Sequence, residues 1–358
     1  MNLPKAKKID IQKYEGGLSK LANITDAIKL SANESALGCS PNAKKAFYDC
    51  QSIISKYPDT SSQALKNKIS EKFNLDLNNI IIGSGSDEII SFACQAFLNP
   101  RDEVVVSEFG FLMYKIYSKI NGANVVFAKE NNYKTNINTI LDCISDKTKL
   151  VFIANPNNPT GTFLTKDEVL ELRKKLRSDI LLLIDDAYCE YVTHKDYLSG
   201  LDLFKKSSNV LVTRTFSKIY GLANLRIGWG FASKEIIDAL SIFKPPFNIT
   251  GPAEQAAVAA LDDNLWLKKN IEHNTYWSNK IFETLSKKNI TCNLPLANFF
   301  LMRFENNKLN SDQIFDEFAK NKIILRKMHA YKINNALRVT VGSKEESELF
   351  IQLIDKIL

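Results

Sequence analysis

Short apolar runs separated by segments of helical length fill the chain between Ile80 and Phe231. The runs are continuous rather than alternating, which is typical of strands buried on both faces of a parallel sheet. They lie at Ile80–Ile82, Glu103–Val106, Leu150–Ala154 and Ile180–Ile184. This alternation predicts an α/β fold whose largely parallel sheet is covered by helices on both faces. The first helix is expected at Ser40-Pro41, a capping residue followed by proline at the first helical position.

Beyond residues 244–247 the order changes to helices followed by strands. The helices are expected at Pro252–Asp262 and Asn264–Lys287, and the strands near Asn298–Phe304, Lys322–Arg326 and Ala336–Val341. Helices followed by mixed strands predict a smaller α+β domain, which the N-terminal segment completes. We therefore expect a large cofactor domain over residues 36–250 and a small domain built from residues 1–35 and 251–358.

The composition is that of an ordinary globular protein, with 358 residues of which 45% are hydrophobic and 24% charged. The chain shows neither a span of membrane-helix length nor the apolar core of a secretion signal, so we expect a cytoplasmic protein. The net charge of +7 comes from scattered lysines, which favours a solvated surface over nucleic-acid binding. Six cysteines and three histidines form no paired or metal-ligating motif, so we expect neither disulfides nor a metal site.

The segment from Thr213 to Arg226 carries the first candidate chemistry. It contains Thr215, Ser217, Lys218 and Arg226 within twelve positions. A lysine amine can bond to an aldehyde cofactor, while hydroxyls and a guanidinium bind the phosphate that anchors it. The combination indicates pyridoxal 5′-phosphate. Taken alone, the pattern fits a solvated lysine and a surface arginine equally well.

Two further polar segments follow buried strands, where ligands of open α/β sheets bind. Asp185 ends one strand, and its carboxylate can pair with a protonated pyridine nitrogen, which keeps the ring an electron sink. Tyr188 can hydrogen-bond the phenolic oxygen of the ring. The turn-rich loop Asn155–Gly161 follows another strand, and Asn158 is the candidate for the same oxygen. Alternatively, Asp185 only caps the chain before a loop, and Asn155–Gly161 is an ordinary Pro/Asn turn.

The run Gly83–Glu88 indicates a glycine loop that opens a helix, with Ser86 or Asp87 as the N-cap. Free N–H groups and the positive dipole end of such a helix bind phosphate. A dinucleotide-binding turn is disfavoured because Glu88 stands where its third glycine belongs. Phe111, at a strand-to-helix turn, is the candidate to stack on the cofactor ring, although aromatics in this position are more often core residues.

Together these segments resemble the fold-type I pyridoxal-phosphate aminotransferases, and within them the histidinol-phosphate aminotransferase group, over almost the whole chain. The matching segments are Leu30–Glu34, Lys56–Asp59, Gly85–Glu88, Gly110–Tyr114, Asn155–Gly161, Asp185–Tyr188, Ser217-Lys218, Arg226 and Leu337–Gly342. The resemblance implies ping-pong transfer of an amino group from L-histidinol phosphate to 2-oxoglutarate, giving imidazole acetol phosphate in histidine biosynthesis. It also implies a homodimer with shared active sites, whose other partners are small-molecule substrates.

The resemblance also implies a role for each candidate. Lys218 is the residue to which the cofactor is attached, and Asp185 is the partner of its ring nitrogen. Asn158 and Tyr188 contact the phenolic oxygen, and Phe111 stacks on the ring. The phosphate is surrounded by Ser86, Asp87, Thr215, Ser217 and Arg226, and by Tyr57 from the other subunit.

Arg338 resembles the family's C-terminal arginine that receives the anionic end of the substrate, and Arg326 resembles its second anion-binding arginine. Arginine is scarce in this lysine-rich chain, so an arginine on a strand suggests a need for a bidentate fork. Ion pairing with nearby acids is the alternative, chiefly for Arg326. Tyr14 resembles the tyrosine of the family's N-terminal arm, which helps to close the partner's site, and a simple tethering loop explains it equally well.

Three other functions remain open on the sequence. An aromatic-amino-acid aminotransferase of the same fold needs nearly the same residues. A threonine-phosphate decarboxylase is similar in sequence and breaks a different bond at Cα. A cofactor-sensing regulatory module is disfavoured, because the fold takes up the whole length and leaves no DNA-binding domain.

Overall fold

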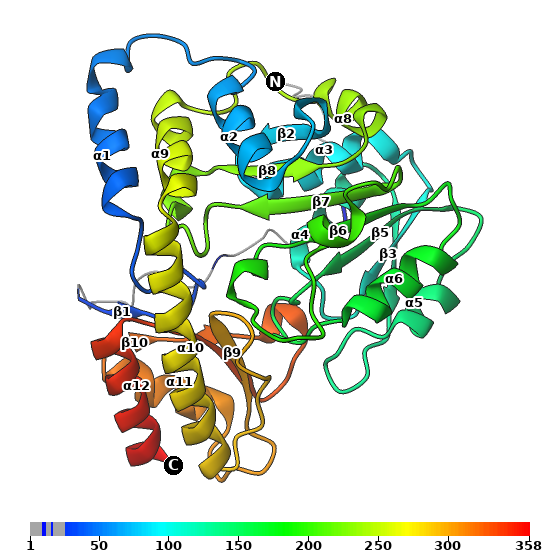
Figure 1. Ribbon diagram of the computed structural model, residues 1–358. Helices are drawn as coiled ribbons and strands as arrows, with labels where there is room; N and C mark the ends of the chain where they lie inside the picture. Colours follow the sequence, from blue (N-terminus) through cyan, green and yellow to red (C-terminus); the bar gives the residue numbers. More distant parts are fainter. Residues whose placement is uncertain (1–8, 12–15, 17–25) are drawn as a thin grey trace, which may run out of the picture.

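The computed structural model describes residues 9–11, 16 and 26–358. A seven-stranded sheet forms the centre of the larger part (Figure 1), in the order β2-β8-β7-β6-β5-β3-β4. Its strands are β2 (Ile80–Gly83), β3 (Glu103–Ser107), β4 (Asn124–Ala128), β5 (Thr148–Ala154), β6 (Leu181–Asp185), β7 (Val210–Thr215) and β8 (Gly228–Phe231). Strand β8 runs antiparallel to β2 and β7, and the other neighbours pair in parallel. The predicted α/β fold with a mostly parallel sheet is confirmed.

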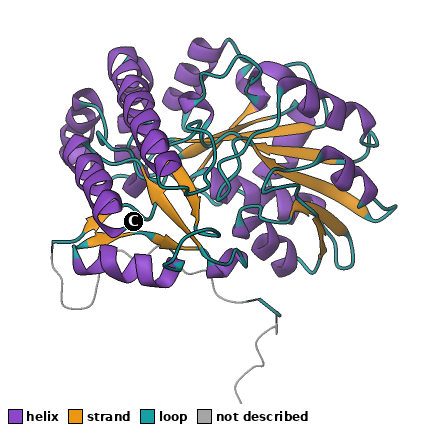
Figure 2. Ribbon diagram, turned by 90° about the horizontal axis from the view of Figure 1, so that it is seen from below, coloured by secondary structure: helices purple, strands orange, loops and turns teal. Residues whose placement is uncertain are grey.

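Alternate residues of each strand enter two different cores, because successive side chains point to opposite faces of a sheet. On β5, for example, Val151 and Ile153 enter one core, whereas Leu150 and Phe152 enter the other. Figure 2 shows helices on both sides of this sheet. Burial on both faces explains why the strands read as continuous apolar runs.

Different helices contribute to the two cores. The first core contains residues of α1 (Pro41–Asp49), α2 (Gln63–Phe73), α5 (Ile137–Asp142), α6 (Lys166–Lys175), α7 (Gly200–Phe204) and α9 (Gly251–Asp262). The second contains residues of α3 (Ser86–Phe97), α4 (Leu112–Ile120) and α8 (Lys234–Ser241). The division expected at residue 250 would assign α9 to the small domain, whereas its alanines pack in the first core.

The C-terminal elements gather in a smaller body, at the bottom of Figure 1. Strands β11-β12-β9 form an antiparallel sheet, and β1 pairs in parallel with β10. The elements are β1 (Ile28–Lys29), α10 (Asn264–Lys287), β9 (Phe299–Arg303), α11 (Ser311–Lys320), β10 (Ile323–Ile324), β11 (Arg326–Lys327), β12 (Ala336–Thr340) and α12 (Lys344–Ile357). Helix α10 connects the two bodies, because Leu267 and Ile271 pack on the first core whereas Ile281 and Leu285 enter the core of the smaller body.

Most predicted element boundaries agree with the structure, and two differ for physical reasons. Ser40 caps α1 as predicted, since its Oγ accepts the Ala43 N–H at 3.1 Å. Helix α3 is capped by Gly85 at φ +86° rather than by Ser86 or Asp87, because glycine adopts that conformation without steric cost. The strand predicted over residues 322–326 is two short strands, since β10 pairs with β1 and β11 with β12.

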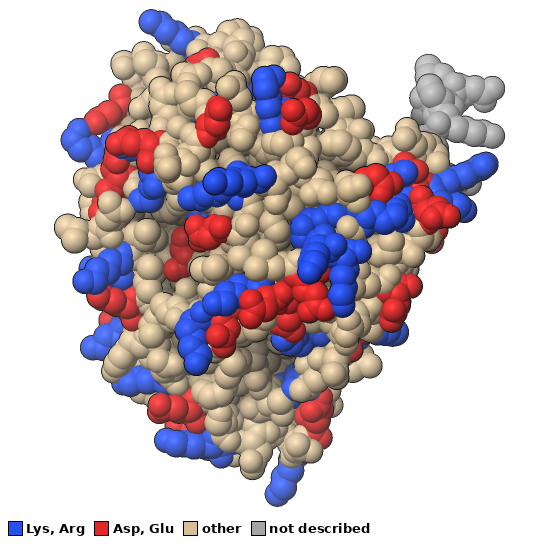
Figure 3. All heavy atoms as spheres, turned by 45° about the vertical axis from the view of Figure 1, so that its right-hand side comes forward, with Lys and Arg blue, Asp and Glu red and all other residues tan. Residues whose placement is uncertain are grey.

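Charged side chains of both signs are interspersed on the face shown in Figure 3. Several pair one helical turn apart, as Lys45 with Asp49 and Lys234 with Asp238 do. None of the helices in the described part of the chain combines the length and apolar character that crossing a membrane requires.

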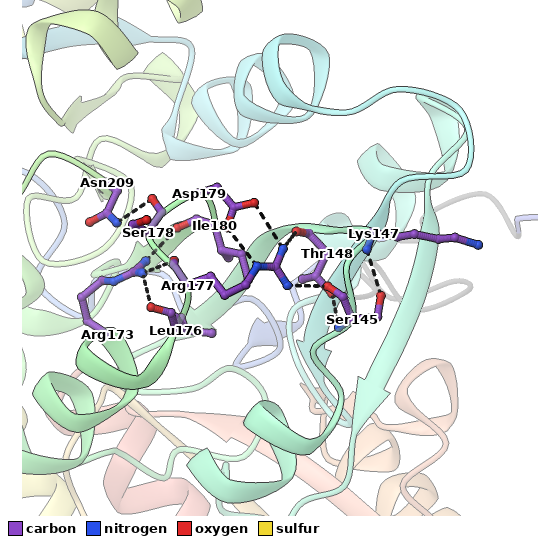
Figure 4. A network of polar contacts seen from close by, with 10 residues as sticks. All are labelled: Ser145, Lys147, Thr148, Arg173, Leu176, Arg177, Ser178, Asp179, Ile180 and Asn209. Atoms are coloured by element: carbon purple, nitrogen blue, oxygen red, sulfur yellow. Dashed lines mark hydrogen bonds and ion pairs between the residues drawn. The ribbon is translucent and has the colours of Figure 1, made fainter.

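An arginine network fixes the turn that leads from α6 into β6 (Figure 4). Arg173 is buried and donates to the carbonyl oxygens of Leu176, Arg177 and Ile180, at 3.0, 2.6 and 2.7 Å. The Arg177 side chain donates to the carbonyl oxygens of Ser145 and Thr148. These contacts join the turns before β5 and β6, at the amino ends of the two strands.

Candidate active site

The carboxyl ends of β2, β5, β6 and β7 lie at one edge of the large sheet, because β2 and β7 both run antiparallel to β8 while β5, β6 and β7 are parallel. A cavity of about 470 Å³ opens at this edge, between the sheet and the smaller body. Among the described residues, every predicted site residue except Tyr57 lines it. These residues are Ser86, Asp87, Phe111, Asn158, Asp185, Tyr188, Thr215, Ser217, Lys218, Arg226, Arg326 and Arg338.

One end of the cavity combines the N-terminus of α3 with the guanidinium of Arg226. Arg226 Nη1 donates to Ser217 Oγ at 3.2 Å. A Cβ atom on Gly85 would lie 2.8 Å from Arg226 Nη2, and one on Gly228 would lie 2.5 Å from the Ser86 nitrogen. Glycine at both positions therefore lets β8 and the arginine approach the start of α3. Helix N–H groups, a hydroxyl and a guanidinium gathered in this way are suited to a phosphate.

Thr215 and Asp87 lie beside this group and are both engaged within the chain. Thr215 Oγ1 accepts the backbone N–H of Ser217 at 3.1 Å. Asp87 Oδ2 accepts the Tyr117 hydroxyl at 2.7 Å, which joins α3 to α4. Burial raises the pKa of Asp87, and the Tyr117 hydroxyl and the Arg226 charge oppose the rise.

Asp185, the last residue of β6, is 6% exposed. Its Oδ2 accepts the Tyr114 hydroxyl at 2.9 Å, and its Oδ1 accepts the Thr213 hydroxyl at 3.4 Å. Burial raises the pKa of Asp185 to about 6, while the Tyr114 hydroxyl and the Ala187 N–H favour the charged form. The carboxylate is therefore fixed in place and suited to pair with a cationic N–H group in the cavity.

Lys218 follows β7 and is half-buried, with its Nζ 3.5 Å from the Ala32 carbonyl oxygen and 5.5 Å from the centroid of the Tyr188 ring. Burial lowers the pKa of Lys218 to about 8; the charge of Arg338 adds to this effect and that of Glu34 opposes it. A lower pKa increases the neutral fraction of the amine at neutral pH. The neutral amine is the form that reacts with an aldehyde.

Asn158 and Tyr188 are each oriented by a neighbour. Arg338 Nη1 donates to Asn158 Oδ1 at 2.5 Å, so the amide nitrogen of Asn158 faces away from the arginine. The Tyr188 hydroxyl accepts from Asn33 Nδ2 at 2.9 Å. Burial raises the pKa of Tyr188 to about 12, so its hydroxyl keeps its hydrogen at neutral pH. Both side chains therefore have a hydrogen to donate in the cavity that they line.

Arg326 and Arg338 stand directly opposite one another on the antiparallel strands β11 and β12. Arg338 also donates to the Ser31 carbonyl oxygen at 3.0 Å, and its guanidinium lies 5.4 Å from the centroid of the Phe299 ring. Both arginines line the same cavity as Lys218. Two adjacent guanidinium groups form a binding place for an anion.

Tyr57 does not line the cavity of its own chain. Tyr57 is 83% exposed and stacks on Phe247, with ring centroids 4.5 Å apart. Tyr14 lies outside the described residues, although Gly16 in the same segment lines the cavity.

Sequence reasoning gave no role to two residues that orient the site, Tyr114 and Asn33. Tyr114 lies in the first turn of α4, three positions after the N-cap residue Phe111, and the two ring centroids are 5.7 Å apart. Its closeness in sequence to a candidate stacking residue was a usable signal. Asn33 contacts Tyr188 across 155 positions of sequence. No local pattern predicts a contact between residues so far apart.

Comparison with known proteins gives the family to which this fold and cavity belong. Residues 25–354 match the family model of aminotransferase class I and II. The chain belongs to the aminotransferase class I and II family. It is 51% identical to the histidinol-phosphate aminotransferase of Pelagibacter ubique, over 100% of this chain and 99% of that protein. It is 38% identical to that of Maricaulis maris, over 99% and 98% of the two chains. The resemblance predicted from the motifs is confirmed.

Solved structures agree with this assignment at the level of the fold. The histidinol-phosphate aminotransferase of Sinorhizobium meliloti, solved in complex with pyridoxal 5′-phosphate, matches with a TM-score of 0.85 at 23% identity, covering 93% of this chain and 92% of that one. The enzyme of the same name from Clostridium acetobutylicum matches with a TM-score of 0.84, at 23% identity and covering 92% and 98%. The aminotransferase described here is a transaminase that depends on pyridoxal 5′-phosphate.

The residues of the cavity fit this cofactor. The cavity offers a phosphate-binding end formed by glycines, hydroxyls and Arg226, a buried carboxylate at Asp185 and an amine of lowered pKa at Lys218. These are the three groups that the phosphate, ring nitrogen and aldehyde of pyridoxal phosphate require.

Proposed function

We propose that this aminotransferase takes the amino group of L-histidinol phosphate and passes it to 2-oxoglutarate, giving imidazole acetol phosphate and glutamate in histidine biosynthesis. The observation that carries the proposal is the pair Arg326 and Arg338, which line the cavity of Lys218 from neighbouring strands. Such a pair can bind the phosphate of one substrate and the carboxylate of the other in turn. The full-length relative from Pelagibacter ubique supports the same substrate.

In this proposal each cavity residue has one task. The cofactor, attached to Lys218, supplies a ring that withdraws the electrons left when the substrate Cα loses its proton. Lys218 Nζ would take that proton as a neutral base. Asp185 would keep the ring nitrogen protonated, Asn158 and Tyr188 would donate to the phenolic oxygen, and Phe111 would contact the ring. The phosphate would be bound by the backbone N–H groups of Ser86 and Asp87, the hydroxyls of Thr215 and Ser217, and the guanidinium of Arg226.

We also propose that two copies of the chain form a dimer with shared active sites. Large apolar side chains are exposed on two segments, 47–57 and 242–247, which meet where Tyr57 stacks on Phe247. The exposed side chains are Phe47, Tyr48, Ile53, Ile54, Tyr57, Ile242, Phe243 and Phe247. Exposed apolar side chains gathered in this way are typical of protein interfaces. In the dimer, Tyr57 reaches the phosphate of the partner's site, and Tyr14 of the N-terminal arm helps to close it.

We also propose a cytoplasmic location and a domain division over residues 36–250 and over 1–35 with 251–358, in which α9 of the second range packs in the first core. The presence of Leu30 in the core of the smaller body supports joining the N-terminal segment to the C-terminal elements. The biosynthetic role implied by the name of the relatives supports the location.

The function is tested by comparing histidinol phosphate, phenylalanine and tyrosine as amino donors to 2-oxoglutarate. We expect the highest kcat/KM with histidinol phosphate. We also expect no release of carbon dioxide, which would indicate a decarboxylase. A phenylalanine value well above that for histidinol phosphate would instead make the protein an aromatic aminotransferase. Lys218→Ala serves as the control, because it should abolish turnover while the circular dichroism spectrum is unchanged. In the wild-type protein, reduction with borohydride should attach the cofactor permanently to residue 218.

A further inference from the structure

Asn33 is held in one orientation from two sides. It lies in the segment after β1, is 1% exposed and has a left-handed backbone conformation with φ +55°. Its backbone N–H donates to Thr340 Oγ1 at 2.9 Å, and the Thr340 hydroxyl in turn lies 3.3 Å from Asn33 Oδ1. Asn298 Nδ2 donates to the Asn33 carbonyl oxygen at 3.2 Å. Because Oδ1 receives the threonine hydrogen, the amide nitrogen must point the other way.

The amide nitrogen of Asn33 points at Tyr188, with Nδ2 2.9 Å from the hydroxyl oxygen. A tyrosine hydroxyl has one hydrogen to donate and lone pairs that accept. An NH₂ group can only donate, so the hydroxyl hydrogen of Tyr188 cannot be directed toward Asn33. Tyr188 is 3% exposed and lines the cavity, with Phe299 set edge-on to its ring. The remaining direction for the hydrogen is therefore into the cavity.

We propose that Asn33 is a positioning residue, which directs the hydroxyl hydrogen of Tyr188 toward the phenolic oxygen of the cofactor. The inference rests on the proposed role of Tyr188 as a donor to that oxygen. Asn33 lines the cavity, but its amide acts through Tyr188, and Thr340 holds it in place. Thr340 follows Arg338 by two residues on β12, so the strand that carries the anion-binding arginine also fixes this donor.

The orientation has a spectroscopic consequence. The phenolic oxygen and the nitrogen that joins the cofactor to Lys218 compete for one proton, and a hydrogen bond donated to the oxygen weakens its hold on that proton. The absorbance of the bound cofactor therefore changes at a lower pH when Tyr188 donates. The charged groups that face Tyr188 are Arg338 on β12, Asp185 on β6 and Lys218 after β7, and a substitution at Asn33 removes none of them.

The experiment measures the pH midpoint of the cofactor absorbance change in the holoenzyme. Asn33→Gly removes the amide and tolerates the left-handed backbone, so the midpoint should rise by about half a unit to one unit, the equivalent of one hydrogen bond. In a Tyr188→Phe background the same substitution should produce no further rise. Asn33→Asp keeps the shape of the side chain but accepts the hydroxyl hydrogen, so its midpoint should rise more than that of Asn33→Gly.

Ser35→Ala is the matched control, because Ser35 lies in the same segment and its hydroxyl bonds Asn270 and the Gly38 carbonyl instead of Tyr188. Its midpoint should equal that of the wild type. Wild-type midpoints in both Asn33 variants, or an Asn33→Gly shift that persists in the Tyr188→Phe background, would overturn the inference. A wild-type midpoint in Tyr188→Phe would contradict the proposed role of Tyr188. If Tyr188→Phe shifts the midpoint and the Asn33 variants do not, the role of Tyr188 stands and only the role of Asn33 is refuted.

Discussion

At the scale of single residues, the charge on Asp185 depends on its hydroxyl neighbours. Its pKa is raised to about 6, so the carboxyl group is protonated below that pH and can no longer pair with a cationic ring nitrogen. We therefore expect non-covalent cofactor binding, measured in a Lys218→Ala background, to weaken as the pH falls through about 6. Tyr114→Phe removes a hydrogen bond to the charged form, which should move this midpoint upward by about one to two pH units.

The measurement is a fluorescence titration of the cofactor at a series of pH values. Tyr197→Phe is a suitable control, because the Tyr197 hydroxyl donates to the Asn155 carbonyl oxygen and not to a carboxylate. It should leave the midpoint in place. An unchanged midpoint in Tyr114→Phe would mean that the hydroxyl does not govern the charge of Asp185.

At the scale of elements, the turn between α6 and β6 depends on one buried guanidinium (Figure 4). Arg173→Met leaves the carbonyl groups of Leu176, Arg177 and Ile180 without their donor. We expect a loss of about 1–3 kcal/mol in the free energy of unfolding, measured with urea. The cofactor absorbance should not change, because the network lies at the opposite end of β6 from Asp185.

Lys174→Met is the control for this prediction, since Lys174 is exposed on the same helix. It should unfold at the wild-type urea concentration. A Lys174→Met protein as unstable as Arg173→Met would show that loss of positive charge on α6, rather than loss of the carbonyl contacts, is responsible.

The elements also show what a sequence can predict and what it cannot. Strands β5 and β6 were predictable because burial on both faces makes them continuous apolar runs, and α10 was predictable at both ends. The division of the predicted strand at residues 322–326 into β10 and β11 could not be predicted. It depends on the partner of each strand, which is β1 for β10 and β12 for β11. Pairing of that kind joins residues far apart in the chain, which a local pattern does not record.

The same distinction applies within the site. Asp185 ends a strand, and Lys218 and Asn158 follow two others. The carboxyl ends of these strands meet, so the convergence of the three residues could be predicted from topology. The residues that orient them could not. Asn33 reaches Tyr188 through a left-handed backbone and a contact with Thr340, 307 positions away. Such supporting contacts depend on how the smaller body docks on the sheet.

At the scale of the whole molecule, the cavity is a product of both bodies. Asp185 ends a strand of the large sheet and Lys218 follows another, whereas Arg326 and Arg338 come from strands of the smaller body. The bond from Arg338 to Asn158 joins the two directly. Substrate anions would therefore bind where the bodies meet, and a change in their relative position would move the arginines with respect to Lys218.

Tyr57 is expected to contribute to the active site of the partner chain. If Tyr57 serves the opposite site, a hybrid dimer of Tyr57→Ala and Lys218→Ala chains contains one complete site, formed by Lys218 of one chain and Tyr57 of the other. Random pairing after mixing, unfolding and refolding should make about a quarter of all sites complete, and activity should recover to that extent from two impaired parents. If Tyr57 served its own chain, no hybrid site would be complete and the mixture would show only the average activity of its parents. Size-exclusion chromatography of the mixture confirms that dimers have formed, and activity at the parental average in such dimers would place Tyr57 outside the shared site.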